Sequence, residues 1–328
     1  MAKKKAEPQF IQSYDSTIRQ LELCGVIPTI KIEDKNKALP LGGALIAADM
    51  RVVEITFRTQ DAVEAIRILT SKFKNILVGA GTIINTQQVT DAVAAGAKFI
   101  ITPSFNPAVV DKCIELNIPV FPGCSSATDI EQAYSKGLRV VKFFPAELLG
   151  GVEMLKALSG PYPFMRFIPT GGINNTNLKK YLDFNKVLCC CGTYIAKENL
   201  LEEDNFEEII KNAREAVEQV IDLQFDHVAL YAGPDTSETI KQAFAQFNGL
   251  SYFREMKNVG GIEPLNKKYD HALGYMVYKS PNLERCIYYL GNRGFEIDKN
   301  TIVRNGQYIE EAFIKGNFGG LGIKLIRA

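Results

Sequence analysis

Two charged side chains interrupt an apolar segment that starts at Arg51 and reads R-V-V-E-I-T-F-R-T. Side chains alternate between the two faces of a strand, so Glu54 and Arg58 share one face and Val53 and Ile55 share the other. If the apolar face packs under helices, the carboxylate and the guanidinium point into the fold, where an unpaired charge costs several kcal/mol. The segment is therefore a candidate acid–base and anion-binding strand. The alternative is a buried Glu–Arg pair that only fills the interior.

A lysine lies inside a second apolar run, L-R-V-V-K-F-F-P-A-E from Leu138. Lys142 shares a strand face with Val140 and Phe144, and such neighbours remove water from the amine. Desolvation disfavours the ammonium form, which leaves the free amine that a nucleophile needs near neutral pH. The alternative is a lysine that reaches solvent along its apolar stem.

The histidine count limits metal chemistry. The chain contains two histidines, His227 and His271, both in its last third. A metal centre built on histidine ligands is therefore not expected in the earlier part of the chain. A nucleophilic lysine with a carboxylate base is the remaining route to cleavage of a carbon–carbon bond there.

The elements that position these residues alternate between short β-branched runs and amphipathic helical stretches up to about residue 217. The apolar runs start at Gly25, Arg51, Ile76, Lys98, Ile118, Leu138, Phe164 and Lys186. A spacing of one strand and one helix per unit, repeated eight times, predicts an α/β fold, a (β/α)8 TIM barrel over residues 16–220. Residues 1–15 are expected to be an N-terminal tail.

Glycine-rich segments close the last two predicted barrel strands. They read PTGG from Pro169 and CGTY from Cys191. Loops after strands seven and eight form the recurrent phosphate site of this fold, because backbone N–H groups face the anion there. Each segment alone could equally be a plain turn, and GAGT at 79–82 is similarly ambiguous. The candidate phosphate ligands are Gly171, Gly172, Gly192 and Thr193.

A different pattern begins after residue 222 and predicts a smaller α+β domain over residues 223–328. FDHVALYA from Phe225 and HALGYMVY from His271 are typical of strands, and each is followed by a helical stretch and by further alternating segments. The pattern indicates two βαβββ-like modules.

Composition excludes several functional classes. The net charge is +1 and 46% of residues are hydrophobic, so neither nucleic acid nor an anionic membrane is an expected partner. No apolar run is long enough to span a membrane, and the N-terminus lacks the apolar core of a signal peptide. The seven cysteines form no C-x-x-C pair, which favours reduced core thiols in a cytoplasmic protein.

The motifs of the predicted barrel together resemble those of a known enzyme family. They are VEITFRT, VGAGT, ITPS, FPGCSS, VKFFPAE, FIPTGGIN and CGTYIA. Over residues 16–218 the chain resembles the 2-dehydro-3-deoxy-phosphogluconate (KDPG) aldolases, which also act as 4-hydroxy-2-oxoglutarate (KHG) aldolases. The resemblance implies a class I aldolase that cleaves KDPG to pyruvate and glyceraldehyde 3-phosphate, and/or KHG to pyruvate and glyoxylate.

The resemblance also implies a role for each matched position. Lys142 would form the Schiff base, and Glu54 would shuttle protons through a bound water. At the pyruvate carboxylate the substrate would be bound by Arg58 and Thr82, with Thr170 near it. The walls of the pocket would be Pro103 and Phe144. The phosphate would be bound by Gly171, Gly172 and Thr193. The resemblance further implies a homotrimer that acts on a phosphorylated 2-keto acid and needs no metal and no cofactor.

Two segments depart from the family pattern. Strand eight reads C-G-T where G-G-S is common, so Cys191 and the methyl group of Thr193 would tighten the phosphate pocket. Strand one reads PTIKI where a PVI-type sequence is commoner, which places Lys31 near the barrel mouth. Both changes leave the preferred substrate open among the phosphogluconate-derived acid, its galactonate epimer and 4-hydroxy-2-oxoglutarate.

The last hundred residues loosely resemble the paired modules of the glyoxalase/dioxygenase (vicinal oxygen chelate) superfamily. That resemblance makes His227 and His271 candidate metal ligands, with Glu255 as a further oxygen ligand. Lys324 stands where an acidic ligand would be expected, which argues against a metal. The favoured interpretation is two strand histidines with satisfied hydrogen bonds, in a module for ligand sensing or oligomerisation. The alternatives are a bifunctional enzyme with a metal-dependent, glyoxalase-like second activity, or a barrel that only binds a small molecule.

Overall fold

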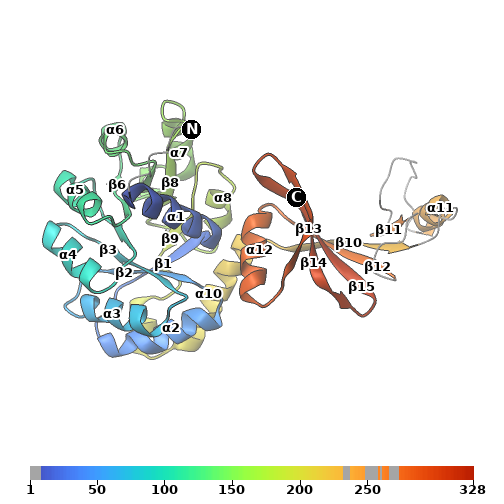
Figure 1. Ribbon diagram of the computed structural model, residues 1–328, viewed down its shortest axis with the longest axis horizontal. Helices are drawn as coiled ribbons and strands as arrows, with labels where there is room; N and C mark the ends of the chain where they lie inside the picture. The colour runs from blue at the N-terminus through green and yellow to red at the C-terminus, as the bar shows by residue number, and fades with distance from the viewer. Residues whose placement is uncertain (1–8, 232–236, 248–257, 259–260, 266–272) are drawn as a thin grey trace, which may run out of the picture. The chain divides into compact units, whose positions relative to one another are not determined.

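The computed structural model describes residues 9–231, 237–247, 258, 261–265 and 273–328. The chain separates into two compact units, Met1–Val220 and Ile221–Ala328. In Figure 1 the first unit runs from blue to yellow, and the second from yellow to red.

The strands of the first unit pair in parallel. Hydrogen bonds connect them in the orders β5-β4-β3-β2-β1-β9 and β6-β7-β8, and isolated bridges join Phe167 to Val187 and Thr170 to Cys191. The predicted α/β barrel-like domain is confirmed at this level. The strands are β1 (Val26–Ile30), β2 (Val52–Thr56), β3 (Leu77–Gly81), β4 (Phe99–Ile101), β5 (Val120–Phe121), β6 (Gly123–Cys124), β7 (Val140–Phe143), β8 (Arg166–Pro169) and β9 (Cys190–Gly192).

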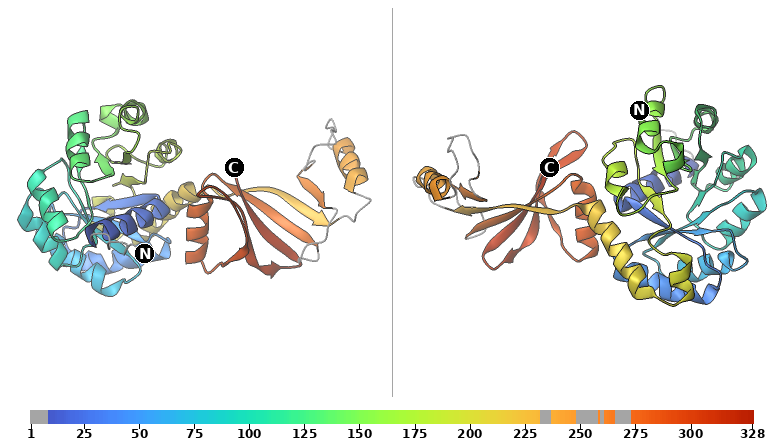
Figure 2. Two further views of the ribbon diagram at one scale, coloured as in Figure 1. Left: turned by 45° about the horizontal axis from the view of Figure 1, so that its top comes forward. Right: turned by 180° about the vertical axis from the view of Figure 1, so that it is seen from behind.

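Helices follow the strands and lie outside them (Figures 1 and 2). Some begin at side-chain caps that satisfy free backbone N–H groups, such as Asn85, Asn106 and the Ser126–Asp129 capping box. The helices are α1 (Gln9–Cys24), η1 (Lys35–Lys37), α2 (Ala38–Ala47), α3 (Ala62–Lys72), α4 (Thr86–Ala94), α5 (Pro107–Glu115), α6 (Ala127–Ser135), η2 (Glu147–Leu149), α7 (Gly151–Ser159), α8 (Leu178–Leu182), α9 (Glu198–Glu202) and α10 (Phe206–Ile221).

An aromatic layer fills the interior toward the amino-terminal ends of the strands. Gly79 faces Phe99 in register, and a Cβ on Gly79 would lie 2.2 Å from the Phe99 ring. The rings of Phe99 and Phe121 are 6.3 Å apart, and Tyr14 of α1 stacks on Phe121 at 5.7 Å. This packing joins α1, β4 and β5 in the interior of the first unit.

Helix α1 begins at Gln9, inside the stretch that the sequence predicts as a tail. Phe10 and Tyr14 are buried on this helix, and burial of these rings explains why the chain is ordered there. The predicted tail is therefore too long.

The second unit is built on one six-stranded sheet, in the order β11-β10-β12-β15-β14-β13. Helix α12 packs on β14 and β15 and buries Leu283, Cys286 and Tyr289. Its elements are β10 (Gln224–Tyr231), α11 (Ser237–Phe247), β11 (Ile262–Leu265), β12 (Gly274–Ser280), α12 (Leu283–Asn292), β13 (Ile297–Asn305), β14 (Tyr308–Phe318) and β15 (Leu321–Arg327).

The prediction of two βαβββ-like modules is met in part. The elements β12-α12-β13-β14-β15 follow the βαβββ order, whereas the described residues before them give β10-α11-β11. Most of the segment between α11 and β12, where further alternating segments are expected, lies outside the described residues. The two halves share one sheet because β10 pairs antiparallel with β12.

Among the described residues, no helix is both long and apolar enough to cross a membrane.

Tyr14 ties α1 to the strand that carries Lys142. Its hydroxyl accepts hydrogen bonds from the backbone N–H groups of Arg139 and Val140, at 3.1 and 3.0 Å, and donates to the carbonyl of Val140. Burial raises the pKa of Tyr14 to about 12, above the value of about 10 expected in the unfolded chain. Its contribution to stability is therefore complete below about pH 10 and is lost as the pH rises through about 12.

We predict that Tyr14→Phe lowers the free energy of unfolding by about 1–3 kcal/mol, because the buried N–H of Val140 and the partly buried N–H of Arg139 lose their acceptor. Denaturant unfolding of the purified protein measures the change. The exposed Tyr134 is the matched control, and Tyr134→Phe should change stability by no more than about 0.5 kcal/mol. Equal effects of the two substitutions would contradict the anchoring role.

Candidate active site

The carboxyl ends of the parallel strands surround a solvent-open cavity of about 750 Å³. Ten of the site residues proposed from the sequence line it, together with four others, whereas Gly192 does not. The lining residues are Thr29, Glu54, Thr56, Arg58, Thr82, Pro103, Lys142, Phe144, Thr170, Gly171, Gly172, Ile173, Cys191 and Thr193.

Glu54 is completely buried on β2, with 0% of its surface exposed. Its Oε2 accepts a hydrogen bond from the Thr29 hydroxyl at 2.8 Å, and its Oε1 has no hydrogen-bond partner. A Cβ on Gly81 would lie 1.8 Å from Oε1, so the missing side chain of Gly81 makes room for the carboxylate. A buried carboxylate oxygen without a partner is costly, which favours a water or a substrate hydroxyl beside it.

Lys142 is 5% exposed on β7, opposite Gly123 of β6 and Ile168 of β8. Its amine lies 4.8 Å from the centroid of the Phe144 ring. The expected burial of this amine among apolar groups is therefore observed. The side chain does not run out to solvent, as the alternative interpretation would require.

Arg58 departs from its expected position. The strand ends at Thr56, and Arg58 is exposed in the loop beyond it at the mouth of the cavity. Its Nε donates to the Thr56 hydroxyl at 3.2 Å, which in turn donates to the carbonyl of Ile30. The guanidinium thus avoids the cost of burial, and the buried Glu–Arg pair considered from the sequence is not formed.

The loop after β8 turns sharply at two glycines. Gly171 and Gly172 have φ values of +96° and +82°, a conformation that disfavours other residues. The carbonyl of Gly172 accepts hydrogen bonds from the side-chain amides of Asn174 and Asn177, at 3.2 and 3.0 Å. These contacts fix the backbone of the loop where it lines the cavity. The sequence pointed to the glycines but not to the asparagines.

At the end of β9, one residue lines the cavity and its neighbour contributes to packing. Thr193 lines the cavity and is exposed, whereas a Cβ on Gly192 would lie 2.5 Å from the Tyr194 ring. Gly192 is not among the lining residues, and its small size makes room for the Tyr194 ring. Helices α8 and α9, after β8 and β9, have five residues each.

Pro103 and Thr82 complete the wall. A Cβ on Gly123 would lie 2.2 Å from the carbonyl oxygen of Pro103, so the backbones of these two segments touch. Thr82 has a φ of +58° directly after β3. Both residues line the cavity, as expected from the sequence.

Four further residues complete the lining, and of these only Cys191 was connected with the phosphate pocket from the sequence. They are Thr29, Thr56, Ile173 and Cys191. Period-two alternation already placed Thr56 on the face of Glu54, so that signal was present. Burial holds the pKa of the Cys191 thiol well above its usual range, so the cavity wall carries a neutral thiol there.

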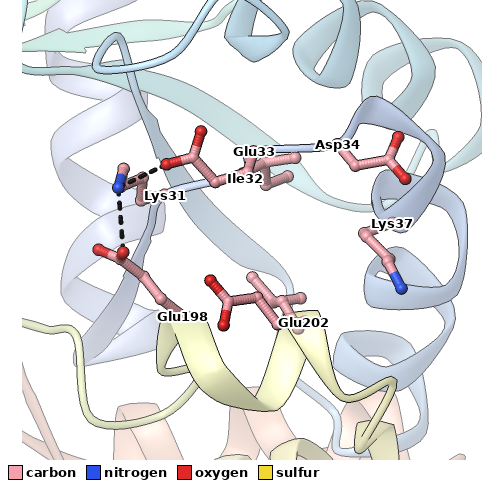
Figure 3. A pocket seen from close by; sticks show the side chains of 8 residues that line it. Lys31, Ile32, Glu33, Asp34, Lys37, Glu198 and Glu202 are labelled. Atoms are coloured by element: carbon pink, nitrogen blue, oxygen red, sulfur yellow. Dashed lines mark hydrogen bonds and ion pairs between the residues drawn. The ribbon is translucent and has the colours of Figure 1, made fainter.

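A second hollow of about 330 Å³ lies beside β1 and α9 (Figure 3). Lys31 pairs there with Glu33 and with Glu198, as the dashed lines in Figure 3 show, and Lys37 pairs with Asp204. The Glu33 contact is the main reason that the pKa of Lys31 is raised. Lys31 directly follows the carboxyl end of β1 and lines this hollow, and it is not among the residues that line the larger cavity.

In the second unit, both ring nitrogens of the buried His227 contact carboxylates. Nδ1 is 2.7 Å from Asp226 and Nε2 is 3.0 Å from Glu263. The contact with His227, followed by the ion pair with Lys279, lowers the pKa of Asp226. This arrangement matches a histidine with satisfied hydrogen bonds.

The other residues considered for a metal site in the second unit do not support one. Lys324 pairs with Glu311 at 2.7 Å, whereas His271 and Glu255 lie outside the described residues. Within the described part of the chain, no group of three or more His, Cys, Asp or Glu side chains is arranged to hold a metal ion.

Comparisons with known proteins agree with this geometry. A family model for KDPG and KHG aldolase matches residues 17–212. The 2-dehydro-3-deoxy-phosphogluconate aldolase of Treponema pallidum (strain Nichols) is 42% identical over 200 residues, 61% of this chain and 95% of that protein. The KHG/KDPG aldolase of Escherichia coli (strain K12) is 40% identical over 193 residues, 59% of this chain and 91% of that protein.

A solved structure also matches the first unit. It is the KDPG aldolase from Legionella pneumophila, with pyruvate captured at low pH as a covalent carbinolamine intermediate. The TM-score is 0.59 at 37% identity, and the match covers 61% of this chain and 97% of that one. Because the family model covers more than half of its length, the chain belongs to the KDPG and KHG aldolase family.

Proposed function

We propose that the first unit is a class I (Schiff-base) aldolase. It cleaves KDPG to pyruvate and glyceraldehyde 3-phosphate, and/or KHG to pyruvate and glyoxylate, the reactions for which its relatives are named. One observation carries the proposal. The buried amine of Lys142 and the buried carboxylate of Glu54 line the same cavity.

In the proposed reaction the amine of Lys142 attacks the 2-keto carbon and gives a carbinolamine. Loss of water then gives an imine, whose protonated nitrogen accepts electrons. A base removes the proton of the 4-hydroxyl, the C3–C4 bond breaks, and the aldehyde leaves behind an enamine. Protonation of C3 and hydrolysis of the imine release pyruvate and restore the amine. No metal or organic cofactor is needed for this sequence.

Glu54 is the proposed proton carrier. Its Oε1 is the oxygen without a partner, so it can accept a hydrogen bond from a water or from a substrate hydroxyl. The carboxylate takes a proton from the carbinolamine or the 4-hydroxyl and returns one to C3, so its own charge is unchanged over the cycle.

The other lining residues would bind the substrate. Arg58, held by Thr56 at the cavity mouth, and Thr82 are suited to a carboxylate, and Thr170 lies close by. The Gly171–Gly172 backbone and the Thr193 hydroxyl are suited to a phosphate, with Pro103 and Phe144 as apolar walls.

We further propose that the first unit is a complete (β/α)8 barrel. Pro122 separates β5 from β6, which supports one interrupted strand, and the Thr170–Cys191 bridge supports closure between β8 and β9. A homotrimer is the assembly that we infer from the family resemblance.

For the second unit, we propose a glyoxalase-like module that senses a ligand or mediates assembly. The βαβββ order of β12 to β15 supports the likeness, and the two carboxylates on His227 argue against a metal ligand. If a metal-dependent activity were present instead, the purified protein would bind a divalent metal that His227→Ala releases. We expect His227→Ala to leave the measured metal content unchanged.

The aldolase activity is tested with a coupled assay of pyruvate release from KDPG, its galactonate epimer and KHG. We expect turnover to be abolished in Lys142→Ala and to fall by about 10²–10⁴ in Glu54→Gln, the usual loss when a general acid–base is removed. Comparison of kcat/KM among the three compounds identifies the preferred substrate. Unchanged turnover in Lys142→Ala would refute the assignment.

The space that Gly81 leaves for the Glu54 carboxylate gives an independent test of the role proposed for Glu54. We predict that Gly81→Ala lowers kcat nearly as much as Glu54→Gln, because the added Cβ displaces the carboxylate. The control is Gly43→Ala on α2, where a Cβ meets nothing within 4 Å, and its kcat should stay at the parent value. A fully active Gly81→Ala enzyme would show that the position of this carboxylate is not required.

A further inference from the structure

The register of β1 and β2 distinguishes the two oxygens of the Glu54 carboxylate. Thr29 and Glu54 face each other directly across the two strands, so their side chains share one face. The Thr29 hydroxyl lies 2.8 Å from Oε2, and both side chains are buried. The backbone ladder holds both residues, so the contact is part of the rigid wall.

The direction of this hydrogen bond follows from the chemistry of its partners. An ionised carboxylate only accepts hydrogen bonds, so the threonine hydroxyl must donate. A donated bond stabilises the negative charge on Oε2 and makes that oxygen a poorer proton acceptor. Oε1 has no partner and faces the space left by Gly81.

We propose that Thr29 is a positioning residue that holds Oε2 of Glu54 and thereby makes Oε1 the oxygen that takes and returns the proton. This inference rests on the proposed aldolase function. During turnover a proton moves from the substrate or its water to Oε1 and later from Oε1 back to the substrate. The hydroxyl of Thr29 keeps its own proton throughout.

A valine at position 29 keeps the shape of threonine and removes the donor. We expect Thr29→Val to lower kcat by about 10- to 100-fold, the effect of losing one hydrogen bond to a charged group. KM should change by less than about threefold, and the acid limb of the kcat profile should move to higher pH. The other ionisable groups that line the cavity, Arg58, Lys142 and Cys191, are unchanged in this variant.

Thr29→Ser retains the hydroxyl and should keep kcat within about threefold of the parent enzyme. Thr29→Ala provides a second variant without the donor, should the valine variant fail to fold, and the same loss is expected. Thr70 on α3 is the matched control, because its hydroxyl lies within hydrogen-bond distance of the carbonyls of Ile66 and Ala95, outside the cavity. Thr70→Val should alter stability but not kcat.

A double variant tests whether Thr29 acts through Glu54. If it does, Thr29→Val adds no further loss to Glu54→Gln, because residues that act as a unit are not additive. Additive losses, or a Thr29→Val enzyme with the parent kcat and pH profile, would overturn the inference. A parent enzyme that releases no pyruvate would refute the proposed function itself, which keeps the two failures distinct.

Discussion

The first unit depends on the burial of two ionisable side chains among its parallel strands. Glu54 and Lys142 lie on β2 and β7, which do not pair with each other, yet both line one cavity. The chemistry proposed for these two groups requires that they be shielded from bulk water and still be reached by a substrate. The arrangement of the surrounding residues serves that requirement.

Close packing of side chains shields the interior of the first unit from water. Helix α1 and the rings of Tyr14, Phe99 and Phe121 fill the amino-terminal end of the interior. Glycines at 79 and 81 then provide space where it is needed, the first for the Phe99 ring and the second for the Glu54 carboxylate. A side chain at Gly79 would displace the Phe99 ring, and one at Gly81 would displace the Glu54 carboxylate. The geometry of the site therefore depends on glycine at both positions.

Much of the site could be predicted because strands alternate with a period of two. That rule places Glu54 and Lys142 inward from the sequence alone, and glycine-rich strand ends mark the loop at Gly171 and Gly172. It fails at Arg58, because alternation assumes that the strand continues, whereas β2 ends at Thr56. Partners across strands could not be predicted either. The contact of Thr29 with Glu54, and that of His227 with Glu263, depend on register, which the sequence of a single chain does not specify.

Trapping of the imine tests the central claim most directly. Sodium borohydride added to the enzyme with pyruvate reduces the imine to a stable secondary amine, and peptide mass mapping locates the modified residue. We expect one pyruvate-derived adduct, on Lys142, and none in Lys142→Ala. An adduct on any other lysine, or none in the parent enzyme while it turns over substrate, would contradict it.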